Sequence, residues 1–409
     1  MDNKEQLLNI KEIPSDINFW LIRTKSGLFY EEFKNNSFIA IGWNNIDKNI
    51  IEYLNKSKIE DTKKIFESKK EKVIKEIKEL WGVEKRVASQ NLNKSERFIQ
   101  EVKKGDIVMF PSKGSGEITF AIVGEYFERN ISSIKELEVE RRIQSKQFDY
   151  LQEVCPYKKC RNIEIIETVS GSRIHPKLYE ALVSRHGISD INDYAEYVLS
   201  SIYVLYCWGN RLNLAIRVEK KDRIDGFEFS KLMYNMSKII KECNDDIQLT
   251  TRANLNSPGL LELIMGFGNN VTDIIQNPYV IKAISIIGIG ICGGKYGDKT
   301  INSLLDVVMK WKKQNSELKD AELSREQKIK ALEREDIITE QAKNQLEKEK
   351  IETEMSREKL EQEKIKTQIV RKVAEDISVK EIAEAAENLS VNAEEIKKVI
   401  NISDFFSEK

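Results

Sequence analysis

Short apolar runs separated by polar turns dominate the first 130 residues of the chain. Three of them lie in residues 18–23, 37–43 and 104–111, and each ends on a charge, a glycine or a proline. Runs of this length with such ends are typical of buried strands. A fourth run at 118–123 follows a Lys-Gly-Ser-Gly turn, so we expect it to return beside the third run as its partner strand. The pattern predicts a small β-barrel.

Helical spacing appears between these runs. Apolar residues recur at intervals of three and four from 65 to 80, where a Trp-Gly pair ends the pattern, and a second helix is predicted over 95–102. Strand and turn signals continue to about residue 193. We therefore predict one N-terminal domain over residues 15–193.

Residues 196–298 have the pattern of a small α/β middle domain. Two strand-like runs at 201–208 and 212–218 are joined by Gly-Asn-Arg, which predicts a hairpin. An amphipathic helix is predicted over 227–243, and a strand over 260–265 after a Ser-Pro-Gly turn.

The longest apolar run covers residues 283–294. It is shorter than the roughly 20 residues that a membrane-spanning helix needs. Its β-branched residues and glycines favour a buried strand or a tightly packed helix, with contact to a membrane as the alternative.

The last third of the chain is charged and helical in character. Residues 300–370 begin with an amphipathic helix at 301–318 and continue as a highly charged long helix whose apolar residues lie four or five apart. Because a coiled coil needs an average spacing of about 3.5, we interpret this segment as a solvated single helix. A loose coiled coil or a helical arm bound to a partner are the alternatives.

Residues 375–405 form a small helical tail. Helix-capping patterns begin at Ser378 and Asn392. The tail is interpreted as a docking or oligomerisation element, with a helix-turn-helix as the alternative. The fold class is thus predicted to be α+β and multidomain.

Charge and cysteine content narrow the possible functions. The 409 residues include 66 basic and 67 acidic side chains, a net charge of −1, so contact with nucleic acid requires a local basic patch. The five cysteines are scattered, which predicts free thiols in a reducing, cytoplasmic compartment. Cys155 and Cys160 lack a second pair of ligands, and we predict no metal site and no cofactor.

The order of motifs at the front resembles a known family. Residues 20–23, the Ile-Ala-Ile-Gly-Trp run at 39–43, the Lys-Gly-Asp at 104–106, Arg141 with Arg142, and the segment 174–188 are similar to the PUA-like, or EVE-like, domain of Mrr-type restriction proteins. The resemblance covers less than half of the chain. The Asp and Glu-x-Lys motif of the nuclease half that usually follows in that family is not recognisable.

This resemblance implies a pocket that receives a flipped base or a free nucleotide between aromatic rings. Stacking on an aromatic face stabilises a bound base by about 1–3 kcal/mol. For Trp20, Trp43 and Phe110 the alternative is a place in the hydrophobic core, and for Arg141 and Arg142 it is a solvated face. The candidate rings, phosphate contacts and polar groups are Trp20, Trp43, Trp81, Phe110, Arg23, Lys25, Lys113, Asn91 and Ser112.

The resemblance therefore implies a bacterial antiphage or restriction-type sensor of a modified nucleobase or nucleotide. The C-terminal helices, residues 300–409, are expected to form a homo-oligomer or to recruit an effector protein. No catalytic constellation emerges from the two histidines, so an enzymatic activity is not expected. A divergent restriction-type nuclease and a non-enzymatic oligomeric scaffold are the alternatives.

Overall fold

The computed structural model describes residues 8–148, 154–184, 186–220, 223–243, 247–253, 259–266, 277–292 and 377–400, with short stretches between 347 and 372. Side chains are described up to residue 141 in the first of these ranges. The chain divides into two compact units. The front unit is Pro14–Ile202, and the second unit combines Met1–Ile13 with Tyr203–Lys409. The structure is mixed α+β, as the sequence predicts at this coarse level.

A six-stranded sheet that curls into a half-barrel forms the centre of the front unit. Its spatial order is β3-β6-β5-β4-β2-β7, and all neighbours are antiparallel except the parallel pair of β2 and β4. The predicted third and fourth runs do pair with each other, as β4 and β5. The strands are β2 (Phe19–Ile22), β3 (Phe38–Ile41), β4 (Ile107–Pro111), β5 (Glu117–Glu128), β6 (Lys159–Ser170) and β7 (Ile188–Asp190).

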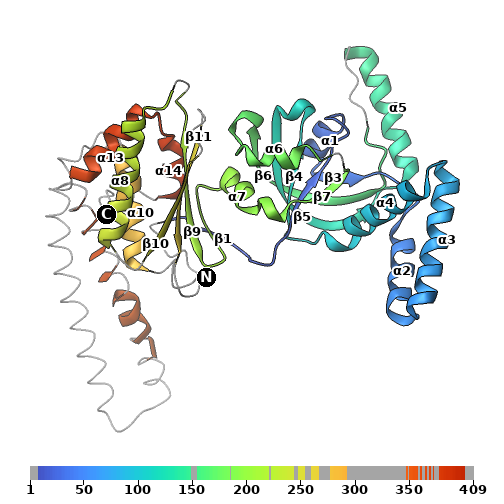
Figure 1. The fold of residues 1–409 in the computed structure, drawn as a ribbon, viewed down its shortest axis with the longest axis horizontal. Helices are drawn as coiled ribbons and strands as arrows, with labels where there is room; N and C mark the ends of the chain where they lie inside the picture. The colour runs from blue at the N-terminus through green and yellow to red at the C-terminus, as the bar shows by residue number, and fades with distance from the viewer. Residues whose placement is uncertain are drawn as a thin grey trace, which may run out of the picture. The chain divides into compact units, whose positions relative to one another are not determined.

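Helices of the front unit fill the connections between these strands (Figure 1). Helices α2, α3 and α4 pack on one another around their own small apolar cluster. Asp47 caps the start of α2 through the amide of Ile50, and Gly82 ends α3 in a left-handed conformation. The helices are α1 (Tyr30–Asn35), α2 (Lys48–Glu60), α3 (Lys63–Trp81), α4 (Lys85–Glu96), α5 (Ile131–Phe148), α6 (Lys177–Leu182) and α7 (Ala195–Ile202).

One helix prediction needs correction at its boundaries. The sequence predicts a helix over 95–102, whereas α4 runs to Glu96 and continues directly as a π-helical turn, Arg97–Glu101. The wider turn is followed by the buried Val102 and by the turn that leads into β4.

The second unit contains a five-stranded sheet in the order β1-β8-β9-β11-β10. The predicted hairpin is present, since β8 and β9 pair antiparallel, and β11 pairs with both β9 and β10. The strands are β1 (Lys11–Ile13), β8 (Leu205–Trp208), β9 (Arg211–Val218), β10 (Gln248–Ala253) and β11 (Gly259–Gly266).

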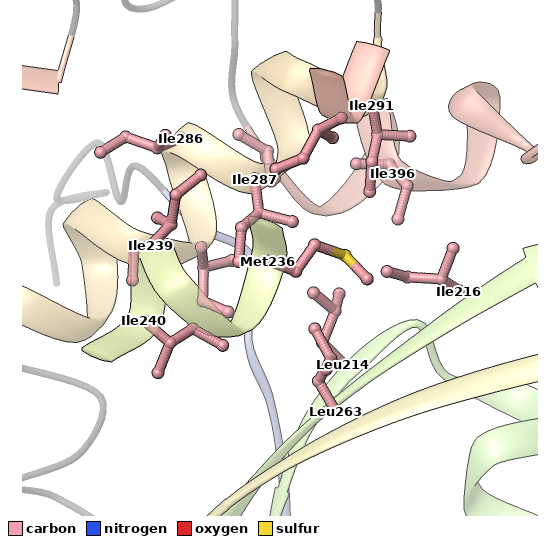
Figure 2. Close-up of a cluster of buried hydrophobic side chains, with 14 of the residues drawn as sticks. Leu214, Ile216, Met236, Ile239, Ile240, Leu263, Ile286, Ile287, Ile291 and Ile396 are labelled. Atoms are coloured by element: carbon pink, nitrogen blue, oxygen red, sulfur yellow. The ribbon is translucent and has the colours of Figure 1, made fainter. Parts of the chain in front are cut away.

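Helices α8 (Gly226–Cys243), α10 (Pro278–Ile291), α13 (Ile377–Asn388) and α14 (Ala393–Val399) gather on one face of this sheet (Figure 1). They bury one large hydrophobic core with the strands. In Figure 2, Met236 of α8 points toward Leu214 and Ile216 of the sheet, and Ile287 of α10 lies near it. The apolar run at 283–294 is therefore helical up to Ile291, one of its two predicted forms.

No helix in the described part of the chain is both long enough and apolar enough to cross a membrane.

The sequence predicts that the C-terminal helices are separate from the middle domain, but the structure packs them into the same unit. Val379, Ile382 and Ile396 belong to the core of the second unit, so α13 and α14 are not a tail set apart from the middle domain. Ile369 is fully buried in the same core and Ile365 packs against it, although the spacing predicts a solvated helix there. The predicted helix at 301–318 and most of the charged segment lie outside the described residues.

Candidate functional site

Three of the predicted site residues are buried inside the front unit. Trp20 is 3% exposed, and its indole Nε1 donates a hydrogen bond of 2.8 Å to the buried carboxylate of Asp106. Phe110 is fully buried against the rings of Tyr30 and Phe33. Asn91 is buried in α4. All three are therefore packing residues. For Trp20 and Phe110 this is the place in the hydrophobic core that the sequence left open.

Arg23 is bound to backbone rather than free to meet phosphate. Its Nε donates to the carbonyl of Ser184 at 2.9 Å, and its terminal nitrogen also contacts the carbonyl of Leu182 at the end of α6. Its own amide donates to the carbonyl of Gly187. Cations suit the last carbonyls of a helix, and Arg23 thereby fixes the segment that follows α6.

Lys25, Ser112 and Lys113 lie together at a turn of the half-barrel. The turn that contains Lys25 has positive φ angles through Gly27, where a Cβ would lie 2.3 Å from the amide nitrogen of Lys113. Ser112 accepts a hydrogen bond from the amide of Glu117 and closes the turn before β5. This turn is a tight local structure that brings Lys25, Ser112 and Lys113 together, whereas Arg23 and Asn91 lie elsewhere in the front unit.

Trp81 stands apart as the last residue of α3. Its side chain is 44% exposed. In the described part of the chain, Trp81 makes no contact with the other predicted rings.

Trp43 is half-buried and packs against both the front-unit core and the small apolar cluster of α2 to α4. It follows β3 with a φ of +59°, a conformation that is costly for a bulky residue. Its carbonyl accepts hydrogen bonds from the amide of Ile46 and from the side chain of Lys159. Asn44, next in the chain, bonds to the backbone of Pro156 and Lys158. The loop is therefore fixed, and the indole is held half-buried.

Two groups flank the indole of Trp43. The ammonium of Lys94 lies 5.2 Å from the ring centroid, within range of a cation–π interaction. At the ring edge, a Cβ on Gly187 would lie 3.5 Å from the indole. Trp43 thus lies between α4 and the segment that Arg23 fixes.

A cleft of about 450 Å³ opens along that same segment. Its lining includes Arg97, Glu180, Ser184, His186, Asp190 and Tyr194. Gly187, between the lining residues His186 and Ile188, lies next to the edge of Trp43, which does not itself line the cleft. We call this cleft the Trp43 cleft. Its volume falls in the range of small-molecule sites, which is roughly 300–1,000 Å³.

The walls of the Trp43 cleft are held by buried polar contacts. The hydroxyls of Ser184 and Ser189 lie 2.8 Å apart, and Arg23 anchors the backbone beneath them. On the opposite side, Arg161 donates to the carbonyls of Phe98 and Ile99 in the π-helical turn. Wider helical turns of this kind recur at functional sites. Arg161 thereby fixes the backbone of the two residues that follow Arg97.

Lys159 is the unusual charge of the site. It is fully buried, and loss of solvation lowers the pKa of its amine to about 7, even though the carboxylates of Glu128 and Asp47 favour the charged form. Its contact with the Trp43 carbonyl links this buried amine to the loop that presents the indole.

The sequence missed Lys94, Arg97, His186, Asp190 and Tyr194. Lys94 and Arg97 are three residues apart on a helical stretch, which is the spacing of neighbours on one helix face. This spacing is the feature of the sequence that could have indicated a pair of cations. The sequence offers His186 as a possible metal ligand or catalytic base and as part of the segment 174–188, but nothing in a linear pattern brings this segment or β7 to Trp43.

Other candidate chemistry is structural. Cys155 and Cys160 are free, buried thiols in the front core, and burial raises the pKa of each to about 12. Among the described residues, no group of three or more His, Cys, Asp or Glu side chains is arranged to hold a metal ion. The guanidinium of Arg141 lies 3.5 Å from the buried carboxylate of Glu32; the side chain of Arg142 lies outside the described set.

Comparison of the chain with models of known protein families, with curated proteins and with solved structures finds no match.

Proposed function

We propose that the front unit binds a modified nucleobase or nucleotide in the Trp43 cleft. The observation that carries this proposal is the Trp43 loop, in which a half-buried indole is held in a strained conformation beside a cleft of nucleotide size. Tyr194 supplies an aromatic ring in the cleft itself. Flat rings stack on such faces, and the serine and carboxylate groups of the wall suit the polar edge of a base.

The motif order of the front unit supports the same proposal. The curled sheet is compatible with a PUA-like or EVE-like domain, which is the fold that the resemblance implies. In this proposal the protein is a cytoplasmic sensor of bacterial antiphage defence. Its second unit and C-terminal helices then assemble the protein or recruit an effector.

Substitution of Trp43 tests the ligand site. The full-length protein is titrated with deoxynucleosides and deoxynucleoside monophosphates, unmodified and carrying methyl or hydroxymethyl groups on the base. Trp43→Ala is expected to weaken binding at least about fivefold, because stacking on an aromatic ring contributes about 1–3 kcal/mol per base. Binding is measured by calorimetry.

Trp81→Ala is the matched control, since it also removes an indole but at the exposed end of α3. It should leave the affinity unchanged. Equal losses of affinity in both variants, or an unchanged affinity in Trp43→Ala, would contradict a ligand site in the Trp43 cleft. Cleavage of modified DNA by the unaltered protein would instead favour the divergent nuclease.

A further inference from the structure

Two cations lie near the Trp43 cleft: Arg97 lines it, and Lys94, three residues earlier on the same helical stretch, lies over the Trp43 ring. Lys94 is half-buried above the Trp43 ring, and no carboxylate in the described part of the chain pairs with it. Loss of solvation lowers its pKa. A partly desolvated ammonium without a counter-ion is unfavourable until an anion reaches it.

Arg97 follows one turn later and lines the cleft directly. Its ion pair with Glu101, 3.2 Å long, joins side chains that are 40% and 54% exposed. Exposed pairs of this kind contribute little, about 0–1 kcal/mol, so Arg97 is free to exchange Glu101 for a better anion. Its planar guanidinium matches the oxygens of a phosphate group.

The backbone that carries these two side chains is held in place. Arg97 opens the π-helical turn, and the guanidinium of Arg161 binds the carbonyls of the next two residues, Phe98 and Ile99. The hydroxyl of Ser95, between the two cations in sequence, is buried without a hydrogen-bond partner. A fixed pair of donors on one helix face loses little conformational entropy when it binds.

The surrounding helices add a broader positive field. Residues 48–101, which form α2 to α4 and the π-helical turn, hold 14 basic and 10 acidic side chains, although the whole chain has a net charge of −1. A local surplus of this size attracts phosphate groups toward the cleft from solution.

We infer that Lys94 and Arg97 form a phosphate clamp, so that the ligand of the Trp43 cleft is a phosphorylated nucleoside rather than a free base or nucleoside. This inference rests on the proposed function and adds the chemical class of the ligand. The phosphate belongs either to a free nucleotide or to a nucleotide displaced from a nucleic-acid strand.

The test compares each deoxynucleoside with its own 5′-monophosphate on the full-length protein. We expect the monophosphate to bind at least tenfold more tightly, with an advantage that shrinks as salt is raised. Lys94→Gln and Arg97→Gln should each remove most of this advantage, so that the ratio of the two dissociation constants falls toward one. Lys85→Gln, at the start of the same helix and exposed, is the matched control and should retain the advantage.

Equal affinity for nucleoside and monophosphate overturns the clamp and leaves the base site standing. The clamp is also overturned if Lys85→Gln loses as much of the monophosphate's advantage as Lys94→Gln does. Any lysine of the helix would then contribute equally through its charge. Absence of binding to both members of every pair overturns the proposed function as well. A single-stranded oligonucleotide with the same base distinguishes the two sources: tighter binding than the mononucleotide supports a clamp on a strand, and equal or weaker binding supports a clamp on a free nucleotide.

Discussion

At the scale of single residues, Lys159 couples a buried charge to the conformation of Trp43. The amine donates to the carbonyl of Trp43, and the nearby carboxylates of Glu128 and Asp47 offset only part of its desolvation. Lys158 and Cys160 also contribute to the charge environment. The resulting pKa of about 7 lies far below the ordinary 10.5 of a lysine.

This shift predicts a pH dependence of stability. Between about pH 7 and 10.5 the unfolded chain binds a proton at Lys159 that the folded chain has released, so the free energy of unfolding rises with pH across that window. Below pH 7 the cost of the buried charge is fully present. Lys159→Met should therefore stabilise the front unit at pH 6, on the order of 2 kcal/mol after the lost hydrogen bond is counted.

The gain should shrink as pH rises toward 10. Urea unfolding at pH 6, 8 and 9.5 measures this gain in stability, with hydrogen exchange in peptides of β4 to β6 as the probe of the front unit. Lys104→Met, an exposed lysine paired with Glu125, serves as the control and should show no such trend. A constant difference between Lys159→Met and the unaltered protein at all three pH values would contradict the argument.

At the scale of elements, the fit of α10 against α13 and α14 depends on two glycines. A Cβ on Gly288 would lie 1.9 Å from the terminal methyl of Ile400, and one on Gly290 would lie 3.0 Å from a methyl of Ile382. The absence of side chains at these positions allows the C-terminal helices to approach α10 closely. The two glycines of α10 therefore suit a helix that is buried against other helices.

Gly288→Ala should destabilise the second unit by about 1–3 kcal/mol, because added volume in a packed core forces neighbours to move. The intrinsic preference of a helix for alanine, about 1 kcal/mol over glycine, acts in the opposite direction. Gly226→Ala in α8, where no atom lies within 4 Å of the added Cβ, is the control and should be neutral or stabilising. Thermal unfolding of the full-length variants gives the comparison; a more stable Gly288→Ala protein would show that the contact relaxes without cost.

At the scale of the whole molecule, the boundary between the units follows α7. This helix contacts α6 and β6, and Tyr197 of α7 stacks on His175 with ring centroids 4.4 Å apart. Val198 and Leu199 are buried. The front unit accordingly extends to Ile202, beyond the residue 193 that turn signals indicate.

A fragment of residues 14–202 should fold independently, whereas a fragment of residues 14–193 should be several kcal/mol less stable. The shorter fragment lacks the buried Val and Leu side chains of α7, each of which contributes about 1.5–3 kcal/mol. Circular dichroism with thermal and urea unfolding measures both. Equal stability of the two fragments would assign α7 to the second unit or to a linker.

Sequence alone determined the local elements, because they depend on short-range patterns. The four apolar runs of the front unit became strands, β8 and β9 form the predicted hairpin, and the helices at 63–81 and 226–243 follow their apolar spacing. Sequence also indicated Trp43 as a ring at a strand end. It did not separate Trp43 from Trp20 and Phe110, since a buried and a half-buried aromatic residue after an apolar run have the same pattern.

Only the tertiary structure decided which residues share a site and which helices share a core. The end of β3, the end of α4 and the segment before β7 meet around Trp43 and its cleft, and the first and last of these lie more than 140 residues apart in the chain. Likewise, Ile369, Ile382 and Ile396 join the core of strands that precede them by about 150 residues. Long-range packing selects these contacts, and periodicity within a window of a few turns carries no information about them.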